Sequence, residues 1–325
     1  MNTGLRPSRN EDAAALHHIW KTVFGGGDED LFFSSYYDPE LCIVAEVNNT
    51  PAATGFILPV GNMVGGDRSV PCAMIYAVAT LPEYRSRGFG KAIVNELISA
   101  GRAAGYPAIV LCPSEDSLFE YYSSRSELRD WFYTKEKTLD VPLSVESMAE
   151  INHGSSTAKL ISLDVEDYAC LRKDLLSATP HIESDIKALS YQNSLCSQYG
   201  GGMFRTETTE GISCVTIERQ TDGSVWVKEL LTPDDSSYYT ETGTLTAIIS
   251  KFPASRYVVR TPVKKEAAFG SPGSIGVSAY DDRTNDIFIT RDSVVRRFGM
   301  LTSVPGISDI EYSKNALPWY GFAFD

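Results

Sequence analysis

The first part of the chain alternates between apolar patterns typical of helices and patterns typical of strands. Apolar residues three and four positions apart predict an amphipathic helix over 11–24, which Gly25-Gly26-Gly27 ends, and a short aromatic-rich helix over 28–37. Apolar runs predict strands over 41–47, 53–60, 70–79, 106–112 and 131–141, and helical spacing returns over 90–104 and 115–122. This order predicts an α/β domain in which helices pack on a mixed sheet.

The later part of the chain repeats this order after a mainly helical stretch. Helical spacing recurs over 164–175 and 181–197, and strands over 211–220 and 224–231 flank Asp222-Gly223, a strong hairpin signal. A helix over 240–252 and a strand over 256–261 follow. We therefore predict a first domain over 1–142, a helical connector over 143–200, and a second domain over 201–325 that is a degenerate copy of the first.

Composition and charge narrow the class of protein. The 325 residues are 43% hydrophobic, which suits a packed globular protein of two domains. There is no apolar run of about 18 residues, and the first residues lack the apolar core of a signal peptide, so we expect a cytoplasmic protein without a membrane partner. The net charge of −13 argues against a nucleic-acid partner and favours a cationic substrate, although an acidic surface also simply maintains solubility.

Cysteine and histidine give no sign of a metal or a disulfide framework. None of the six cysteines forms a C-x-x-C pair, and the four histidines lack metal-ligand spacing. Most of the cysteines lie in apolar runs, as expected for small buried side chains in a reducing compartment. We predict no bound metal.

Residues 85–91 carry the clearest chemical signal in the chain. They lie between a predicted strand and a predicted helix, so that successive backbone N–H groups converge where the helix begins. Gly88 and Gly90 let a ligand approach the backbone, and three basic residues add positive charge: Arg85, Arg87 and Lys91. This pattern therefore indicates a site that binds a pyrophosphate, rather than a basic turn that is merely solvated. The chain has no G-x-x-x-x-G-K-[ST] pattern, which excludes a Walker loop. The segment also lacks the third glycine of a dinucleotide-binding fingerprint.

The same residues resemble those of a known family. The sequence VATLPEYR over 78–85, continuing into R-x-x-G-x-G, resembles the pyrophosphate-binding motif of the GNAT superfamily of N-acetyltransferases. The resemblance covers about residues 3–140, and 24–37 and 113–119 resemble a bacterial two-domain group with a degenerate second domain, similar in layout to Eis-type acetyltransferases. It implies a GNAT-like mixed twisted sheet flanked by helices, with a second, degenerate GNAT-like α/β domain. It also implies acetyl-CoA as cosubstrate.

The resemblance assigns roles to particular residues. Main-chain groups of Val78, Ala79 and Thr80 would contact the pantetheine arm and the acetyl carbonyl. The pyrophosphate would lie against Arg85, Ser86, Arg87, Gly88, Phe89, Gly90 and Lys91, and the pantetheine would pass Ser114 and Glu115. Tyr122, in preference to Tyr121, would be the general acid that protonates the leaving thiolate.

Some positions depart from the family pattern. Arg125-Ser126-Glu127-Leu128 stands where the family usually has Gly-Phe, so the corner after the tyrosine is expected to differ. The general base stays open among water, Tyr76, Glu46 and the C-terminal carboxylate at Asp325. In the second copy, Asp234 and Asp235 stand where the loop would begin and would repel a pyrophosphate, so we predict no cofactor there.

The predicted activity is transfer of an acetyl group from acetyl-CoA to a primary amine, on a small molecule or a peptide, by direct attack in a ternary complex. The second half would shape the substrate pocket or a homodimer surface. One alternative is a non-catalytic acyl-CoA-binding sensor. Another is a tandem transferase that uses aminoacyl-tRNA, against which the intact loop and the acidic charge argue.

Overall fold

The computed structural model describes residues 3–141, 158–208, 211–233, 238–264, 288–304 and 316–324. Contacts divide the chain into two units, Met1–Trp131 with Phe298–Ile310 and Phe132–Arg297 with Glu311–Asp325. The boundaries fall within strands β6 (Arg129–Asp140) and β13 (Ile289–Leu301). These units group residues by contact alone, so the three-part division at 142 and 200 stays a prediction.

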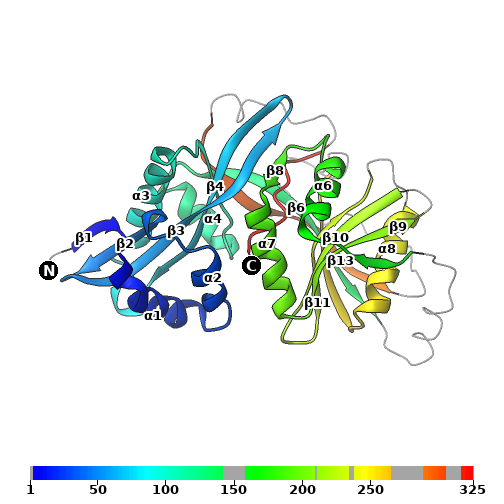
Figure 1. The fold of residues 1–325 in the computed structure, drawn as a ribbon, viewed down its shortest axis with the longest axis horizontal. Helices are drawn as coiled ribbons and strands as arrows, with labels where there is room; N and C mark the ends of the chain where they lie inside the picture. The colour runs from blue at the N-terminus through cyan, green and yellow to red at the C-terminus, as the bar shows by residue number, and fades with distance from the viewer. Residues whose placement is uncertain are drawn as a thin grey trace. The chain divides into compact units, whose positions relative to one another are not determined.

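The first unit is an α/β fold, as the sequence predicts. Its elements are β1 (Thr3–Pro7), α1 (Ala13–Phe24), α2 (Glu29–Ser35), β2 (Cys42–Val47), β3 (Thr50–Gly65), β4 (Arg68–Thr80), α3 (Phe89–Ala103), β5 (Ala108–Leu111) and α4 (Asp116–Ser123). Strands β1 to β5 lie side by side in chain order, antiparallel except for the parallel pair β4 and β5. Helices α1 and α2 cover one face of this sheet and α3 covers the other (Figure 1).

Local sequence explains the hairpin between β2 and β3. Asn48 and Asn49 both adopt left-handed backbone conformations, with φ of 51° and 64°, which asparagine tolerates in a two-residue turn. Thr50 and Pro51 already belong to β3. Pro51 is tolerated there because it lies where the β2–β3 register shifts, so the missing N–H interrupts no regular ladder.

The face of the sheet beneath α3 holds the main apolar core of this unit. Its α3 side chains are Ile93, Val94, Leu97 and Ile98, all buried. Gly101 allows close packing, since a Cβ at this position would come within 2.5 Å of Ile57 and 2.7 Å of Ile109. Helix α3 thus packs closely on the sheet at Gly101.

The opposite face carries an aromatic cluster beneath α1 and α2. Trp20 and Phe32 stack with ring centroids 4.9 Å apart, and Tyr76 lies 5.8 Å and 5.6 Å from these two rings. Phe56 of β3 packs 4.8 Å from Phe32. Such ring pairs add stabilisation beyond burial alone. The aromatic residues of the second predicted helix therefore cover the sheet directly beside strand β4.

The second unit repeats the topology of the first. Its elements are β7 (Leu160–Ser162), α6 (Val165–Leu175), β8 (His181–Ser184), α7 (Ile186–Gln198), β9 (Gly202–Thr208), β10 (Gly211–Arg219), β11 (Val225–Leu231), α8 (Tyr238–Lys251) and β12 (Arg256–Thr261). The sheet order is β7-β9-β10-β11-β12-β6, antiparallel except for β11 and β12. Two helices precede β9, and α8 connects the parallel strands, as α3 does in the first unit. The second unit is therefore an α/β fold with the same element order as the first.

The predicted helix over 181–197 is partly wrong. Residues 181–184 form strand β8, and Asp185 caps the shorter helix α7 by accepting a hydrogen bond from the Ala188 N–H, 2.8 Å away. His181 bridges to Trp319, and the Ile182 N–H donates to the Trp319 carbonyl. Local spacing does not reveal this pairing, because its partner lies near the other end of the chain. Strands β1, β7, β9 and β13 were also not predicted.

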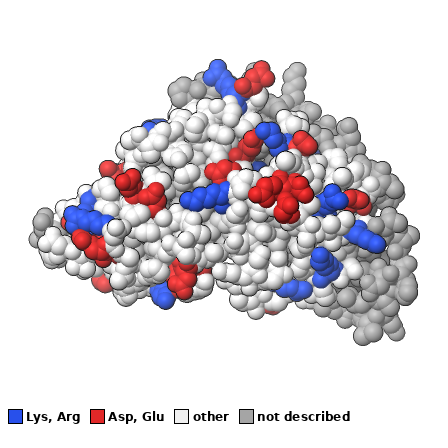
Figure 2. All heavy atoms as spheres, in the orientation of Figure 1, with Lys and Arg blue, Asp and Glu red and all other residues white. Residues whose placement is uncertain are grey.

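The cysteine side chains have the surroundings that the sequence predicts. All six cysteines are free thiols, and four are buried. No group of possible metal ligands occurs among the described residues. No helix within those ranges is both long and apolar enough to cross a membrane. On the face shown in Figure 2, acidic and basic side chains form small interspersed groups.

Candidate functional site

Strand β4 carries a bulge close to its carboxyl end. Ala77 and Val78 together oppose the single residue Gly55 of β3, and the flanking register pairs are Phe56 with Tyr76 and Thr54 with Ala79. Ala77 has a left-handed backbone, with φ of 48°, which is uncommon for a residue with a side chain. Bulges of this kind bend a strand and are frequent next to active sites.

The bulge shifts the side-chain alternation of β4 by one position. Ile75 and Val78 are three residues apart, yet both pack in the core beneath α3. Ala79 instead packs against Ile19 of α1. In a regular strand, residues an odd number apart point to opposite faces. The shift therefore redirects the peptide groups between residues 76 and 79.

Gly55 allows the bulge to form against α3. A Cβ at this position would come within 2.8 Å of Leu97 and 2.9 Å of Ile93, closer than real side chains pack. The bulge was not predicted, although a glycine inside an apolar strand is a recognised sign of one.

The parallel ladder between β4 and β5 ends immediately before the bulge. Its last pair is Ile75 with Leu111, although β4 continues to Thr80. After Leu111 the chain leaves the sheet and enters α4 at Asp116. Within the described ranges, residues 76–80 thus have no ladder partner on the β5 side. Their main-chain groups form an open edge next to the bulge.

The loop after β4 presents backbone N–H groups at the start of α3. Ser86 and Gly88 both have left-handed backbones, with φ of 62° and 84°. Gly88 is the N-cap residue, and no side chain caps the helix. The Ala92 N–H donates to the Gly88 carbonyl at 3.1 Å, so the helix begins here and the preceding N–H groups lack intrahelical acceptors. This geometry suits an anion.

The three basic residues predicted for the loop are exposed beside this helix end. Arg85 Nε donates to the Thr80 carbonyl at 3.3 Å, which ties the loop to the end of β4. Arg87 donates to the Glu83 carbonyl at 3.1 Å and lies 5.2 Å above the ring of Tyr84. Together with Lys91 they give the loop a positive charge.

Ser114 and Glu115 are exposed residues of the segment between β5 and α4. Because β4 and β5 are parallel, this segment leaves the sheet at the same edge as the loop after Thr80. Glu115 is the N-cap residue of α4. Topology thus brings both residues to the edge where the open main chain of β4 lies.

The two neighbouring tyrosines of α4 have different surroundings. Tyr122 packs against the core beneath α3, and burial raises its pKa to about 12. Tyr121 lies edge-on to it, with ring centroids 5.2 Å apart, and carries the Arg125 guanidinium 4.4 Å above its ring. The structure brings the Tyr121 hydroxyl, rather than that of Tyr122, to Gly90: a Cβ on Gly90 would lie 3.0 Å from it.

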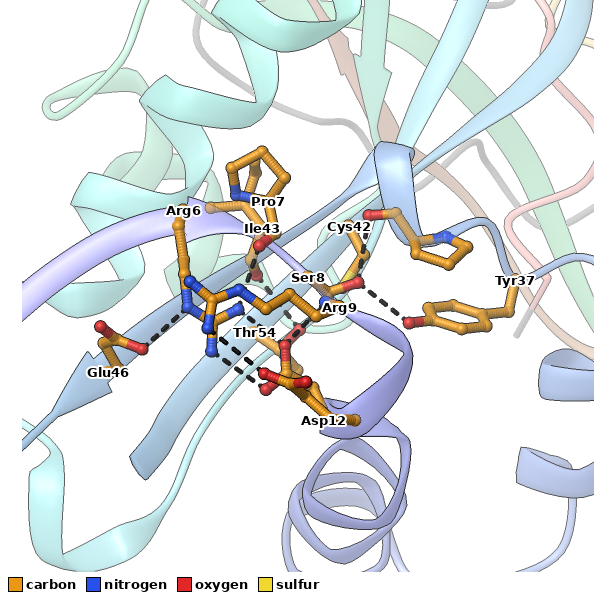
Figure 3. A network of polar contacts seen from close by, with 12 residues as sticks. Arg6, Pro7, Ser8, Arg9, Asp12, Tyr37, Cys42, Ile43, Glu46 and Thr54 are labelled. Atoms are coloured by element: carbon orange, nitrogen blue, oxygen red, sulfur yellow. Dashed lines mark hydrogen bonds and ion pairs between the residues drawn. The ribbon is translucent and has the colours of Figure 1, made fainter. Parts of the chain in front are cut away.

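The candidate general bases are not equivalent. Glu46 forms an ion pair with Arg6, whose Nε lies 2.8 Å from the carboxylate (Figure 3). Arg6 also binds Asp12 at 2.7 Å, and this hydrogen bond lowers the pKa of Asp12. Tyr76 belongs to the aromatic cluster, and Asp325 lies outside the described residues. The Arg6 network joins β1, β2 and the turn before α1, and it was not predicted from the sequence.

The first unit thus combines a bulged strand, an open parallel edge and a turn whose backbone N–H groups suit an anion. Residues 4–125 match the family model described as acetyltransferase (GNAT) domain. The likeness to the GNAT acetyltransferase family thus covers this segment of the chain, which holds the bulge and the loop. No curated protein matches the chain by sequence.

Solved structures share the fold across both units. A GCN5-related N-acetyltransferase from Anabaena variabilis ATCC 29413 is 16% identical with a TM-score of 0.61, over 92% of this chain and 72% of that one. A probable N-acyltransferase from Enterococcus faecalis V583 is 14% identical with a TM-score of 0.61, over 94% and 73%. Eis1 from Mycobacterium abscessus is 14% identical with a TM-score of 0.56, over 93% and 74%. At these identities the likeness shows the fold alone.

Proposed function

We propose that the protein is an N-acetyltransferase that transfers an acetyl group from acetyl-CoA to a primary amine. The observation that carries the proposal is the sequence of features over residues 76–91: an open bulged strand, a turn with two left-handed residues, and an uncapped helix start. All of them lie within the segment that matches the acetyltransferase domain.

The donor is expected to lie along this segment. Backbone N–H groups from Ser86 to Lys91 would bind the pyrophosphate, with charge from Arg85, Arg87 and Lys91. The pantetheine arm would follow the open edge of β4, where main-chain groups of Val78, Ala79 and Thr80 lie beyond the parallel ladder. Ser114 and Glu115 would border it from the β5 side.

The chemistry follows from the bulge and from Tyr122. The neutral amine attacks the thioester carbon directly, and a redirected N–H of the bulge stabilises the charge that develops on the carbonyl oxygen. As the carbon–sulfur bond breaks, Tyr122 donates its proton to the leaving thiolate, and the proton of the new ammonium group passes to a base such as water. With a pKa of about 12, the phenol stays protonated throughout the ordinary pH range.

The acceptor is proposed to be a cationic amine on a small molecule or a peptide. Tyr76, the residue before the bulge, lies within the aromatic cluster with Trp20 and Phe32. Aromatic faces attract ammonium groups, and a net charge of −13 favours approach of cations. Tyr76 is the half-buried member of this cluster, so its ring and the acidic composition support the same class of substrate.

The direct test is release of free CoA from acetyl-CoA, followed with a thiol reagent, in the presence of a panel of polyamines, aminoglycosides and peptides. We expect at least one amine to accelerate thiol release and to be recovered in acetylated form. Calorimetry with CoA runs in parallel. Tight CoA binding with no accelerating amine would instead support an acyl-CoA sensor, and no CoA binding would contradict the donor site.

A further inference from the structure

The neighbouring tyrosines of α4 offer two hydroxyls, of which only one has an evident role in the proposed reaction. Tyr122 is held in the core beneath α3. Tyr121 is turned toward the start of α3, since a Cβ on Gly90 would lie 3.0 Å from its Oη and 4.0 Å from its Cζ. The closest approach is thus made by the hydroxyl itself and not by the ring.

This position places the hydroxyl beside the unpaired N–H groups of the helix. In an α-helix the Cα–Cβ bond tilts toward the N-terminus. A group that meets the Cβ direction of Gly90 therefore lies next to the first turn, where α3 has no side-chain cap. Among the described residues, the Tyr121 hydroxyl has no hydrogen-bond partner, so its proton is available to a ligand at this turn.

The ring of Tyr121 is held in place from two sides. The Arg125 guanidinium lies 4.4 Å above the ring and donates to the Tyr121 carbonyl at 3.3 Å. The Arg125 carbonyl in turn accepts from the side-chain amide of Asn95 on α3, at 3.1 Å. The same amide donates to the Lys91 carbonyl at 2.9 Å. These contacts fix the end of α4 against the first turns of α3.

We propose that Tyr121 is a phosphate ligand of the donor site: its hydroxyl donates a hydrogen bond to the pyrophosphate held at the start of α3, and Arg125 positions its ring. This inference rests on the proposed function and deepens it. Arg125 belongs to the segment that replaces the Gly-Phe of the family pattern. Positioning of the Tyr121 ring gives this difference in sequence a function. The two tyrosines then have separate tasks, donor binding for Tyr121 and proton donation for Tyr122.

The first test compares donors with and without phosphate groups in the Tyr121→Phe variant. A hydrogen bond to a charged group is worth enough that its loss is expected to weaken CoA binding about tenfold, with kcat at saturating acetyl-CoA unchanged. With S-acetylpantetheine, which lacks the pyrophosphate, kcat/KM of the variant should equal that of the wild type. An unchanged CoA affinity, or an equal loss with both donors, would overturn the inference.

The second test uses Gly90, whose added methyl group would meet the hydroxyl. Gly90→Ala is expected to weaken CoA binding in the wild-type background. The added Cβ would lie 3.0 Å from the Tyr121 Oη and would push this hydroxyl away. In the Tyr121→Phe background that contact is gone, and the same substitution should have a clearly smaller effect. Equal effects in the two backgrounds would show that the hydroxyl does not bind the ligand.

The proposed function and the role of Tyr121 as a phosphate ligand are contradicted by different results. If the wild-type protein does not bind CoA, the proposed function itself is wrong. If the wild type binds CoA and both tests show no dependence on the Tyr121 hydroxyl, only its role as a phosphate ligand is wrong. The thermal midpoint of each variant, measured alongside, identifies any loss that comes from unfolding.

Discussion

The two units of the chain carry the same bulged strand but surround it differently. In the first unit the parallel ladder of β4 ends at Ile75, and the bulge follows directly. In the second unit the ladder of β11 ends at Val227, and Lys228 is the extra residue. In each case an α-helix follows the strand. Shared topology thus provides the same break in the sheet twice.

The residues at the break decide what each unit can do with it. The first unit has Ala77 there, whereas the second has the buried pair Lys228 and Glu229. Glu229 accepts hydrogen bonds from three side chains, Tyr168 at 2.8 Å, Arg172 at 2.9 Å and Trp319 at 2.6 Å. Lys228 lies 3.4 Å from Glu218. In the first unit, main-chain groups next to the bulge are left open to a ligand. In the second unit, Lys228 and Glu229 occupy this position and form ion pairs with Glu218 and Arg172.

The second unit therefore has a structural reason to lack a donor site. Asp234 and Asp235, on which the sequence argument rested, lie outside the described residues. A separate reason is the cluster of Tyr168, Arg172, Glu229 and Trp319, called here the Glu229 cluster. Glu229 accepts from Trp319, and Arg172 donates to the Tyr320 carbonyl, so the cluster binds the segment 316–324 of the same unit. We propose that this cluster is structural and that only the first unit binds CoA.

The largest effect is expected from removing the buried carboxylate of the second unit. Glu229→Ala leaves the Arg172 guanidinium buried without its carboxylate, which costs about 3–5 kcal/mol of unfolding free energy. The control is Glu207→Ala, which breaks an exposed pair with Arg205 and should cost less than about 1 kcal/mol. Urea unfolding measures both. Equal losses in the two variants would show that the cluster does not hold the second unit together.

Acid is expected to act on the second unit through His181. Burial lowers its pKa to about 4 from the ordinary value of 6.5, so the folded state disfavours its protonation. The contribution of neutral His181 to the free energy of unfolding is fully present above pH 6.5. It is lost as the pH falls toward 4, and the total loss is about 3 kcal/mol. His181→Gln should flatten this pH dependence of unfolding, whereas His18→Gln, at an exposed position of α1, should not. A slope that persists in His181→Gln would refute the assignment.

Within the first unit, the largest effect on kcat is expected at Tyr122, the proposed proton donor. Tyr122→Phe should lower kcat about 100-fold, because the thiolate leaves without a positioned acid, while CoA affinity stays the same. Tyr106→Phe is the matched control, since this tyrosine packs against the same core. A pre-steady-state measurement of thiol release separates chemistry from product release. Activity retained in Tyr122→Phe would move the role of acid to another group.

A smaller effect is expected at the helix start. Gly88 and Gly105 lie at opposite ends of α3, with φ of 84° and 94°, and neither has another atom within 4 Å of an added Cβ. Alanine at either position introduces similar backbone strain of about 1 kcal/mol. Only Gly88→Ala should weaken CoA binding, by about tenfold. Similar affinities in the two variants would argue against an anion site at the start of α3.

Most helices and central strands of the first unit, and the hairpin, helix and last strand of the second, could be predicted because periodicity is a local property of the sequence. The stripes of α1 and α3, the apolar runs of the central strands and the Asp222-Gly223 hairpin all fall where the pattern indicates. The loop over 85–91 was also predictable, because glycine, basic residues and a following helix occur together in a few positions.

The remaining features depend on partners that are distant in the sequence. Glu229 and Arg172 form an ion pair only when β11 and α6 meet, and the bridge from His181 of β8 reaches Trp319, which is far along the chain. The approach of Tyr121 to Gly90 is likewise a contact between two helices. The bulge at Ala77 is intermediate, since Gly55 signals a break but not which residue of β4 is displaced.

The central claim is that one donor site exists and that the loop of the first unit forms it. Calorimetric titration with CoA tests it in three proteins: the wild type, a triple Arg85→Ala, Arg87→Ala, Lys91→Ala variant, and a control triple Lys173→Ala, Lys187→Ala, Lys251→Ala variant. Both triples remove the same charge, but the control residues are exposed on the second unit. We expect one site per chain in the wild type, an affinity at least 100-fold lower in the loop variant, and little change in the control. Two sites per chain, or equal losses in the two triples, would contradict the account.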